Sequence, residues 1–539
     1  MAAPLPPPAA ADWGALARAM DGELLLDRAS RERYARDESP CEVLPAAVAR
    51  PHSVGGLRAA LAFCAKRGIG VTLRAGGSSL AGQCVGAGLV VDVSDRFERI
   101  LEVDPARGVA TVEPGVVLAR LNDAAAVHGL RFGPDPSSFE SARVGGVVGN
   151  NASGLHHLLW GATVDNIVSL DLLLSNGETM ETRPVRVGSP EHEALSAGST
   201  RAARIWREAP EVIARAQDAI GRHFPVCEKS SSGYRLDKAL EAGVFDPGKL
   251  VCGSEGTLAI VTRATLRLVD IPKARGLTLF LFHSVEDAAR GVALALKTSP
   301  SAVELVDDRV VRLVHERHPG RAPLFPPQAA AAAFVEHVGA DLGEVEQKML
   351  RTWQLLRQES RLAFADQATT DPGTMDQLWA IRRAVEPMLS EVRGARVPVG
   401  FVEDTAVPVE RLAEHLRGMY RIFDARGLQA AAYGHASAGH LHVRPYLDLD
   451  DPADRALLPE VAREVFEHTR RLGGTMSGEH GDGLLRSEFL PGFFGLAYEA
   501  FRAIKELFDP EGVLNPGKKV GAPPGQLAAS LRAPRAGQP

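Results

Sequence analysis

The sequence predicts an α+β fold in which a Gly-rich part precedes an antiparallel sheet covered by helices. Short apolar strands alternate with amphipathic helices along most of the 539 residues. Three Gly-rich turns follow or enter such strands in the first half. Apolar residues make up 45% and charged residues 24% of the chain, as in ordinary globular proteins.

Charge and cysteine content exclude several classes of protein. The chain has 61 basic and 67 acidic residues, a net charge of −6, which argues against nucleic-acid binding and a polybasic membrane module. The start MAAPLPPPAAADWG lacks the features of a secretory signal, and no apolar run is long enough to span a membrane. We therefore expect a cytoplasmic protein, with peripheral membrane association as the alternative. Five scattered cysteines without a C-x-x-C pair exclude a disulfide framework, a zinc ribbon and a four-cysteine iron–sulfur cluster.

The first half of the chain contains short strands and two helices. A helical period covers residues 56–67 and ends at Gly68, and an amphipathic helix is expected at 116–128. Strands are expected at 69–73, 89–92 and 107–112, and a hairpin at 168–174 and 178–182 around Ser-Asn-Gly.

A second section begins near Ile271-Pro272 and repeats an order of strands and helices. Strands are expected at 276–283, 302–306, 331–338, 402–407 and 429–434. Helices are expected at 285–296, 341–358 and 409–425. This order predicts an antiparallel sheet covered by helices.

The three Gly-rich segments are RAGGSSLAGQ (74–83), a small-residue stretch at 134–161, and CGSEGTLAIVT (252–262). Glycine lets the backbone approach a ligand closely, and successive N–H groups cradle phosphate oxygens. None matches the dinucleotide fingerprint or the P-loop, so NAD and ATP are disfavoured. Three such segments in one chain indicate a long ligand wrapped by backbone.

Histidines and carboxylates gather near the C-terminal end. GHASAGHLHVRP (434–445) holds His435, His440 and His442, and SGEHGDG (477–483) adds Glu479 and His480. Imidazole and carboxylate suit a divalent ion such as Zn, Mn or Fe. His440 and His442 share one face of a strand, whereas His435 and His442 converge only if Gly439 bends the chain. Both ligand pairs remain open at this point.

Seven motifs together carry a family resemblance. DRASRERYARDES (27–39), RAGGSSLAGQ, VGGVVGNNASG, GSEGTLAIVT, GHASAGHLHVRP, SGEHGDG and DPEGVLNPGK (509–518) occur in this order. Over residues 20–519 the chain resembles the FAD-linked D-2-hydroxyacid dehydrogenases of the vanillyl-alcohol oxidase superfamily. That group includes D-lactate dehydrogenase, the glycolate oxidase flavin subunit and D-2-hydroxyglutarate dehydrogenase.

The resemblance implies an α+β fold with a two-part PCMH-type FAD-binding domain and a ferredoxin-like antiparallel-sheet cap domain. We expect a disordered tail at 1–19, the FAD-binding domain at 20–270 and the cap, carrying the substrate and metal site, at 271–475. A C-terminal segment at 476–519 is expected to return to the FAD domain, followed by a disordered tail at 520–539.

The resemblance also implies where FAD binds. Non-covalent binding is expected, because covalent relatives often have His where Gly76-Gly77-Ser78-Ser79 stands here. The cofactor-binding residues implied are Arg74, Gly76, Gly77, Ser78, Ser79, Gly82, Gln83, Pro134, Ser137, Ser138, Gly145, Gly146, Asn150, Ser153, Gly154, Glu255, Gly256, Ile260 and Asn515.

The implied catalytic residues lie in the second section. The resemblance assigns His435, His442 and Glu479 as metal ligands and His480 as the base. Arg382, in LWAIRRAVEP, is the expected partner of the substrate carboxylate, because a guanidinium offers two parallel donors.

Three positions depart from the family pattern. Ala438 and His440 replace Asp and Asn, and Val402 stands where a Lys is frequent. The first two changes affect the surroundings of the expected ion. Arg396 and Arg444 are alternative cations for a second carboxylate or a larger substrate.

The implied reaction is oxidation of a D-2-hydroxy acid, of the D-lactate, D-2-hydroxyglutarate or glycolate type, to the 2-oxo acid. A metal lowers the pKa of the hydroxyl, His takes the proton, and FAD accepts the hydride. The large two-part relatives carry an iron–sulfur section after the FAD part, and this sequence has none. Electrons are therefore expected to pass to a partner protein, such as a separate iron–sulfur protein, to a quinone or to O2. Two alternatives remain open: a metal-free flavin oxidase of another alcohol or aryl compound, and a non-catalytic FAD subunit of a larger complex.

Overall fold

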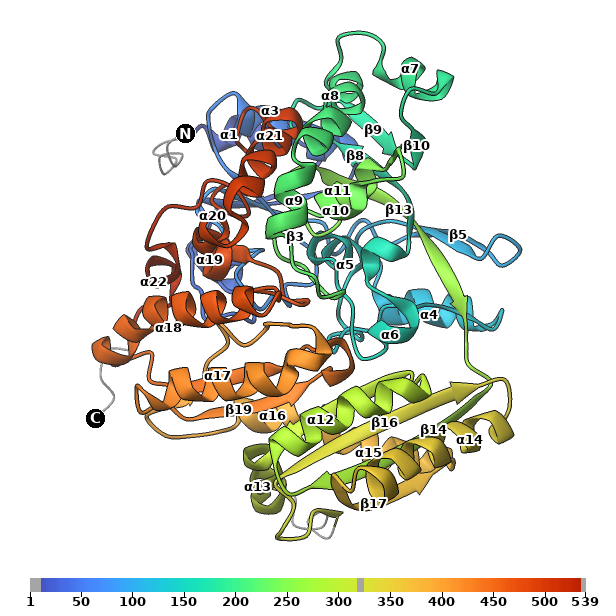
Figure 1. Ribbon diagram of the computed structural model, residues 1–539. Coiled ribbons are helices and arrows are strands. Elements are labelled where there is room, and N and C mark those ends of the chain that lie inside the picture. Colours follow the sequence, from blue (N-terminus) through green and yellow to red (C-terminus); the bar gives the residue numbers. More distant parts are fainter. Residues whose placement is uncertain (1–10, 318–323, 535–539) are drawn as a thin grey trace.

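The computed structural model describes residues 11–317 and 324–534. Figure 1 shows the chain in two layers, with the Gly-rich half above and a large antiparallel sheet with its helices below. The red C-terminal helices return to pack beside the upper half. Helices and antiparallel sheets thus combine as the predicted α+β class requires.

The first sheet has four strands in the order β1-β2-β4-β3. Its strands are β1 (Gly22–Leu25), β2 (Ala47–Pro51), β4 (Leu89–Asp92) and β3 (Val71–Arg74), and the last three run parallel. The helix α3 (Val54–Ala65) links β2 to β3 and begins at Ser53, whose hydroxyl accepts from the Gly56 N–H at 3.1 Å. The carboxyl end of β3 therefore delivers the first Gly-rich loop.

The second sheet is antiparallel and has the order β5-β6-β13-β8-β9, with β7 paired to β13. The predicted hairpin is confirmed, because Leu170 of β8 pairs with Thr182 of β9. The predicted helix at 116–128 is α4. The bounds are β5 (Ile100–Asp104), β6 (Val109–Val112), α4 (Leu118–Ala126), β7 (Leu130–Phe132), β8 (Ile167–Leu173), β9 (Thr179–Thr182) and β13 (Ile260–Asp270).

The lower layer is a seven-stranded antiparallel sheet in the order β17-β14-β16-β15-β19-β20-β18. On β14, Leu277 and Leu279 belong to one apolar cluster while Phe280 and Phe282 belong to another, so alternate side chains pack on opposite faces. The strands are β14 (Ala274–Phe282), β15 (Ala302–Asp307), β16 (Ala331–Gly339), β17 (Ala363–Thr369), β18 (Val397–Pro398), β19 (Ala430–Gly434) and β20 (His442–Leu447).

The predicted covering of this sheet by helices is confirmed, and helices lie on both of its faces (Figure 1). Ala288 and Val292 of α12 pack in the cluster that contains Phe280 and Phe282. Trp379 of α15 packs in the other cluster and stacks on Phe334 of β16. The helices of this layer include α12 (Val285–Ala295), α14 (Leu342–Trp353), α15 (Pro372–Arg383), α16 (Val385–Ser390) and α17 (Leu412–Asp424).

The C-terminal segment closes the upper half. After α18 (Pro452–Arg471) and α19 (Gly483–Arg486), the helix α21 (Tyr498–Phe508) lies against α8 (Arg201–Arg215). The Asn515 N–H then donates to the Val71 carbonyl at 2.7 Å, which attaches the segment to the first sheet. Among the described residues, none of the helices is both long and apolar enough to cross a membrane.

One predicted strand is wrong and two expected tails are partly ordered. Residues 402–407 form a turn in which only Ala406 makes bridges, to His440 and Thr475. The tail expected at 1–19 includes α1 (Trp13–Ala19), which buries Leu16, and that at 520–539 includes α22 (Gln526–Ser530), which buries Leu527. The rest of these tails at 1–10 and 535–539 lies outside the described residues.

A buried ion cluster joins the two layers. His156, beside α6 (His157–Trp160), places Nδ1 2.5 Å from Asp135 Oδ2 and Nε2 2.8 Å from Glu336 Oε1 on β16. Arg275 adds a second cation to Glu336 at 2.6 Å. Burial alone lowers the pKa of His156, but the two carboxylates outweigh it and raise this pKa to about 10.

We expect His156→Gln to flatten the alkaline dependence of stability. In the unfolded chain the His pKa is about 6.5. The contribution of charged His156 is therefore complete below that pH and is lost as pH rises through the folded pKa of about 10. Urea unfolding between pH 7 and 10 should show a steeper loss of stability for the wild type than for the variant. Exposed His128→Gln is the control, and parallel curves for wild type and His156→Gln would contradict the assignment.

Candidate active site at the junction of the two layers

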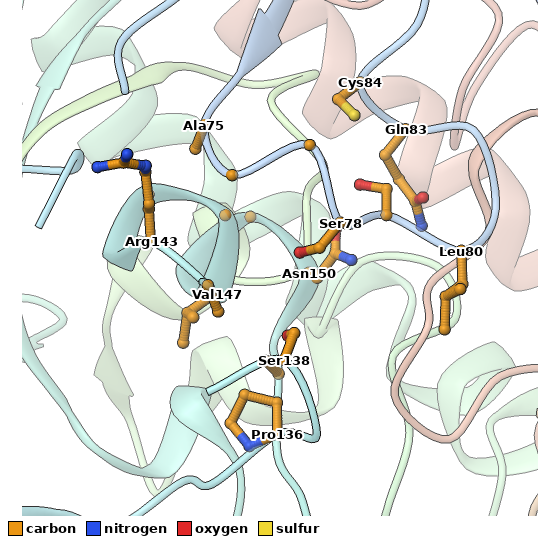
Figure 2. Close-up of a pocket in the computed structure, with 18 of the residues that line it drawn as sticks. Ala75, Ser78, Leu80, Gln83, Cys84, Pro136, Ser138, Arg143, Val147 and Asn150 are labelled. Carbon is orange, nitrogen blue, oxygen red and sulfur yellow. The ribbon is translucent and has the colours of Figure 1, made fainter. Parts of the chain in front are cut away.

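A cavity of about 530 Å³ lies where the three Gly-rich segments meet. This volume is within the range of cofactor and ligand pockets. Figure 2 shows side chains from the first two segments around this cavity, among them Ser78, Ser138 and Asn150. Of the predicted cofactor-binding residues, the cavity is lined by Arg74, Gly76, Gly77, Ser78, Ser79, Gln83, Ser137, Ser138, Gly145, Gly146, Asn150, Ser153, Glu255, Gly256 and Ile260.

Four residues of the predicted set are absent from the lining, namely Gly82, Pro134, Gly154 and Asn515. Pro136, two residues beyond Pro134, lines the cavity instead. Asn515 acts behind the wall, because its side-chain amide donates to the carbonyls of Gln83 at 2.9 Å and Glu255 at 2.6 Å. It thereby holds the first and third Gly-rich segments together.

Glycines set the shape of the wall. A Cβ at Gly76 would lie 2.9 Å from the Ser141 carbonyl oxygen, and one at Gly145 would lie 2.8 Å from Pro114 Cβ. A larger residue at either position would force neighbouring segments apart. At Gly149 of α5 (Val144–Asn150) a Cβ would meet no protein atom within 4 Å, although this residue lines the cavity. The backbone therefore forms a cradle that fits a long, phosphate-bearing cofactor such as FAD.

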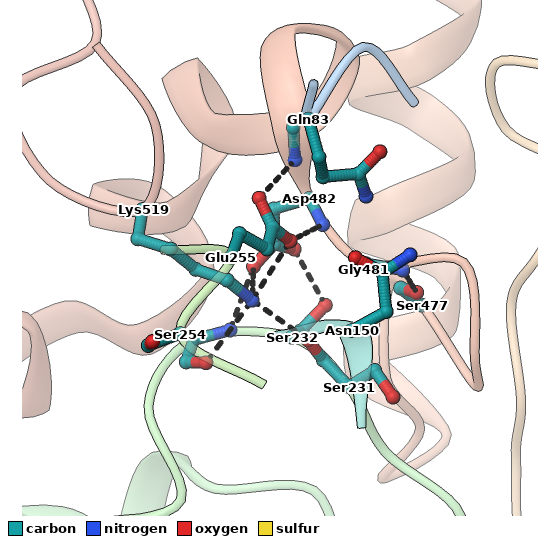
Figure 3. Close-up of polar contacts among 12 residues, drawn as sticks. Gln83, Asn150, Ser231, Ser232, Ser254, Glu255, Ser477, Gly481, Asp482 and Lys519 are labelled. Atoms are coloured by element: carbon teal, nitrogen blue, oxygen red, sulfur yellow. Dashed lines mark hydrogen bonds and ion pairs between the residues drawn. The ribbon is translucent and has the colours of Figure 1, made fainter. Parts of the chain in front are cut away.

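A buried carboxylate fastens this cradle to the C-terminal segment (Figure 3). Glu255 accepts from the N–H groups of Asp482 at 2.6 Å and Gly483 at 2.9 Å. Lys519 lies 3.1 Å from Glu255 and 2.7 Å from Asp482, so one buried cation serves two carboxylates. The loop that carries Glu479 and His480 is thus fixed against the third Gly-rich segment.

The predicted histidines meet because the chain turns between them. His435 directly follows β19, which ends at Gly434, and His442 begins β20, and a 3₁₀ turn at Ala436–Ala438 separates the two histidines. Gly439 follows with φ +64°, and a Cβ there would lie 1.8 Å from the Val407 carbonyl oxygen. The bend at Gly439, required for His435 and His442 to converge, is therefore present.

All three imidazoles surround Glu479. Its Oε1 lies 3.1 Å from His435 Nε2, 3.4 Å from His442 Nε2 and 4.0 Å from His440 Nδ1. One ligand atom from each of the four residues lies within 4.8 Å of all the others, which is a suitable spacing for a metal ion. The two histidine pairs left open by the sequence are thus brought together in one cluster.

The other oxygen of Glu479 faces a buried lysine. Lys229 Nζ lies 2.9 Å from Glu479 Oε2, and the Ser153 hydroxyl donates to the same oxygen at 3.3 Å. Although burial raises a carboxyl pKa, Lys229 and His435 hold the pKa of Glu479 well below its usual value. Sequence analysis missed Lys229, which lies in the small-residue run KSSSGY with no periodic pattern to mark it.

His480 is backed by carboxylates and borders the cavity. Its Nδ1 lies 2.9 Å from Glu403 Oε1, and its backbone N–H donates to Asp404 at 2.8 Å. Glu403 in turn pairs with Arg486 at 3.1 Å. Burial lowers the pKa of His480, but Asp404 and Glu403 outweigh this effect and raise it. Sequence analysis missed both acids, although two adjacent carboxylates in the apolar stretch GFVEDTAVP were a usable signal.

Arg382 lies behind the cluster and does not line the cavity. Its guanidinium bonds Glu304 at 2.6–2.7 Å, and Glu304 also accepts from His435 Nδ1 at 2.7 Å. The neighbouring Arg383 borders the cavity. Glu304 was missed, although an acid in the middle of the apolar strand AVELVD was a signal.

The other sequence candidates for a substrate cation differ in position. Arg396 is paired with Asp454 at 2.7 Å, and neither residue lines the cavity. Arg444 is almost fully buried and lies 2.7 Å from Glu386, which does line it. Of these two arginines, Arg444 is therefore the one that lies next to the cavity.

Comparisons with known proteins agree with this architecture. Residues 45–183 match the family model "FAD binding domain", and residues 271–519 match "FAD linked oxidases, C-terminal domain". A solved 4-ethylphenol oxidase from Gulosibacter chungangensis aligns with a TM-score of 0.67 over 96% of this chain and 98% of that chain, at 16% identity. The fold is therefore the FAD-binding fold with an antiparallel cap.

Sequence relatives define the family more closely. A D-lactate dehydrogenase from Archaeoglobus fulgidus is 30% identical, covering 91% of this chain and 96% of that protein. A D-2-hydroxyglutarate dehydrogenase from Pantoea ananatis is 32% identical over 93% of this chain but 50% of its own length. The chain thus spans about half the length of the latter. It belongs to the family of FAD-linked D-2-hydroxyacid dehydrogenases, and the resemblance seen in its motifs is confirmed.

We expect Gly149→Val to reduce the amount of FAD bound without unfolding the protein. The new side chain would meet no protein atom near its Cβ, so it would occupy the cavity instead. Gly221→Val is the matched control, because Gly221 is also helical with open space around it but does not line the cavity. Flavin absorbance per chain should fall for Gly149→Val alone, and full FAD occupancy in that variant would show that the cofactor lies elsewhere.

Proposed function

We propose that this chain oxidises a D-2-hydroxy acid to the 2-oxo acid with FAD as hydride acceptor. The observation that carries the proposal is that His480, backed by Glu403, borders the Gly-lined cavity beside Glu479 and the imidazole cluster. A base, a candidate metal site and a cofactor cradle are thus adjacent. The relatives' printed activities on D-lactate and D-2-hydroxyglutarate support the same substrate class.

The chain offers residues for both non-protein groups. The Gly-rich segments at 74–83, 134–161 and 252–262 would hold FAD non-covalently, and His435, His442 and Glu479 would hold a divalent ion of the Zn, Mn or Fe type. When bound, FAD accepts the hydride that leaves C2, and the ion lowers the pKa of the substrate hydroxyl.

The side chains then have separate tasks. Glu403 accepts from Nδ1 of His480, which leaves Nε2 with the lone pair that takes the hydroxyl proton. Glu304 orients His435 in the same way, through Nδ1. Arg382 is proposed to bind the substrate carboxylate. Because this Arg bonds Glu304, substrate binding would require its guanidinium to share that partner or to leave it.

The proposal also covers where the electrons go. The five cysteines lie far apart in the sequence without a C-x-x-C pair, so they lack the ligand spacing of an iron–sulfur cluster. We propose that the electrons taken up during the reaction would go on to a separate protein, an iron–sulfur protein among the candidates, or to a quinone. A cytoplasmic location, with peripheral attachment to a membrane as the alternative, completes this proposal.

The decisive experiment is substrate-driven reduction of the bound flavin. Under anaerobic conditions, the purified chain is mixed with D- and L-forms of lactate and 2-hydroxyglutarate, and with glycolate, while the absorbance near 450 nm is followed. We expect bleaching by D-acids and slow or no bleaching by the L-forms. A flavin that no 2-hydroxy acid bleaches, but that an aryl alcohol does, would replace this function with that of a metal-free oxidase.

We expect His480→Ala to lower kcat by about 10²-fold or more while FAD stays bound, because the base is lost and the cradle is kept. Stopped-flow flavin reduction at saturating substrate measures this rate directly. The control is His337→Ala, a buried histidine of β16 that does not line the cavity. Wild-type reduction rates in the His480 variant would place the base elsewhere.

A further inference from the structure

We infer that His440 is a fourth protein ligand of the divalent ion, beside His435, His442 and Glu479. The inference rests on the proposed function, since it concerns the ion which that reaction uses. His440 is fully buried, and its Nδ1 has no hydrogen-bond partner. That nitrogen lies 4.0 Å from Glu479 Oε1, within the cluster of ligand atoms.

Asp404 determines which nitrogen of His440 is free. Its carboxylate accepts from the His480 N–H at 2.8 Å and from the Ser477 hydroxyl, so it acts as an acceptor. His440 Nε2 lies 2.7 Å from Asp404 Oδ1 and must therefore carry the hydrogen. The lone pair is then on Nδ1, which faces the cluster. A carboxylate behind an imidazole is the arrangement that orients metal-binding histidines.

The surrounding backbone leaves room for an imidazole at this position. A Cβ at Gly478 would lie 2.8 Å from Cδ2 of the His440 ring, so a larger residue there would displace it. The ring centroid lies 4.7 Å from that of His442 and 5.5 Å from that of His435. The ring is thus held against both expected ligands.

A buried histidine with one unpartnered nitrogen is not by itself a ligand, and His337 shows the difference. Its Nδ1 also lacks a partner, but its Nε2 lies between the hydroxyls of Thr298 and Thr352, at 3.0 and 3.2 Å. His337 belongs to neither of the described groups of potential metal ligands. His440 differs in having a carboxylate behind it and three potential ligands in front.

A fourth donor changes what the ion offers to substrate. With four protein donors, rather than the three typical of catalytic zinc sites, the ion would need a fifth or sixth position to bind a substrate oxygen. A 2-hydroxy acid carries a hydroxyl and a carboxylate oxygen that would occupy such positions together. Three imidazoles and one carboxylate would suit an imidazole-binding ion of the Zn or Fe type that accepts more than four ligands.

The test measures metal binding rather than turnover. The FAD-loaded full-length chain is stripped with a chelator and titrated with Mn²⁺, and free Mn²⁺ is followed by electron paramagnetic resonance. We expect one ion per wild-type chain and at least about 10-fold weaker binding in His440→Asn. His435→Asn should also lose affinity, while the matched control His337→Asn should bind as the wild type does.

The outcomes separate this inference from the proposed function. If His440→Asn binds Mn²⁺ as tightly as the wild type while His435→Asn does not, the inference is overturned and the metal-assisted reaction stands. If the wild-type chain binds neither Mn²⁺ nor Zn²⁺, yet D-acids bleach its flavin, the reaction does not use a metal ion and the inference about His440 is overturned as well. Should His440→Asn fail to fold, pulsed electron paramagnetic resonance on Cu²⁺-loaded wild type counts the imidazoles. Three imidazoles bound to Cu²⁺ would support the inference, and two would overturn it.

Discussion

The geometry of the site depends on the hydrogen bonds that the carboxylate of Asp404 accepts. It accepts from the His440 ring, the Ser477 hydroxyl and the His480 N–H, and so fastens the turn before β20 to the loop that carries Glu479 and His480. Burial alone would raise its pKa, but the two histidines help to hold the pKa of Asp404 well below its usual range. An apolar residue here would leave the donors of His440, Ser477 and His480 without this acceptor.

Around this anchor, buried charges come in compensated pairs that connect distant segments. Glu304 has Arg382, Glu479 has Lys229, Glu403 has Arg486, and Glu255 has Lys519. Removing one member of such a pair leaves an uncompensated buried charge, which typically costs 3–5 kcal/mol. Each pair therefore matters mainly because it allows a carboxylate to remain charged in the buried site, and less because it stabilises the fold by itself. Glu479, Glu403 and Glu255, which lie on three different loops of the site, are each paired in this way with a cation from another segment.

Local patterns predicted most of the elements, whereas contacts between distant residues were beyond them. The strand expected at 276–283 and the hairpin turn after β8 are encoded by neighbouring residues, and both were predicted correctly. The strand predicted at 402–407 is wrong because the apolar side chains that flank Glu403 and Asp404 also suit a strand. Their carboxylates instead bond groups from elsewhere in the chain. Links such as Thr72 to Asn515, 443 residues apart, leave no trace in local periodicity.

The histidine motif shows why spacing alone could not settle the ligand set. On one continuous strand, His435 and His442 would point to opposite faces, and a choice between two pairs would follow. The 3₁₀ turn and Gly439 divide the motif between two strands, so the rule of alternation does not apply across it. Because the strand is broken, both histidine pairs can belong to one site. His440 lies in the connection between His435 and His442 and faces Glu479. How many imidazoles reach an ion there is decided by the turn and by Asp404 behind it, and neither follows from counting residues.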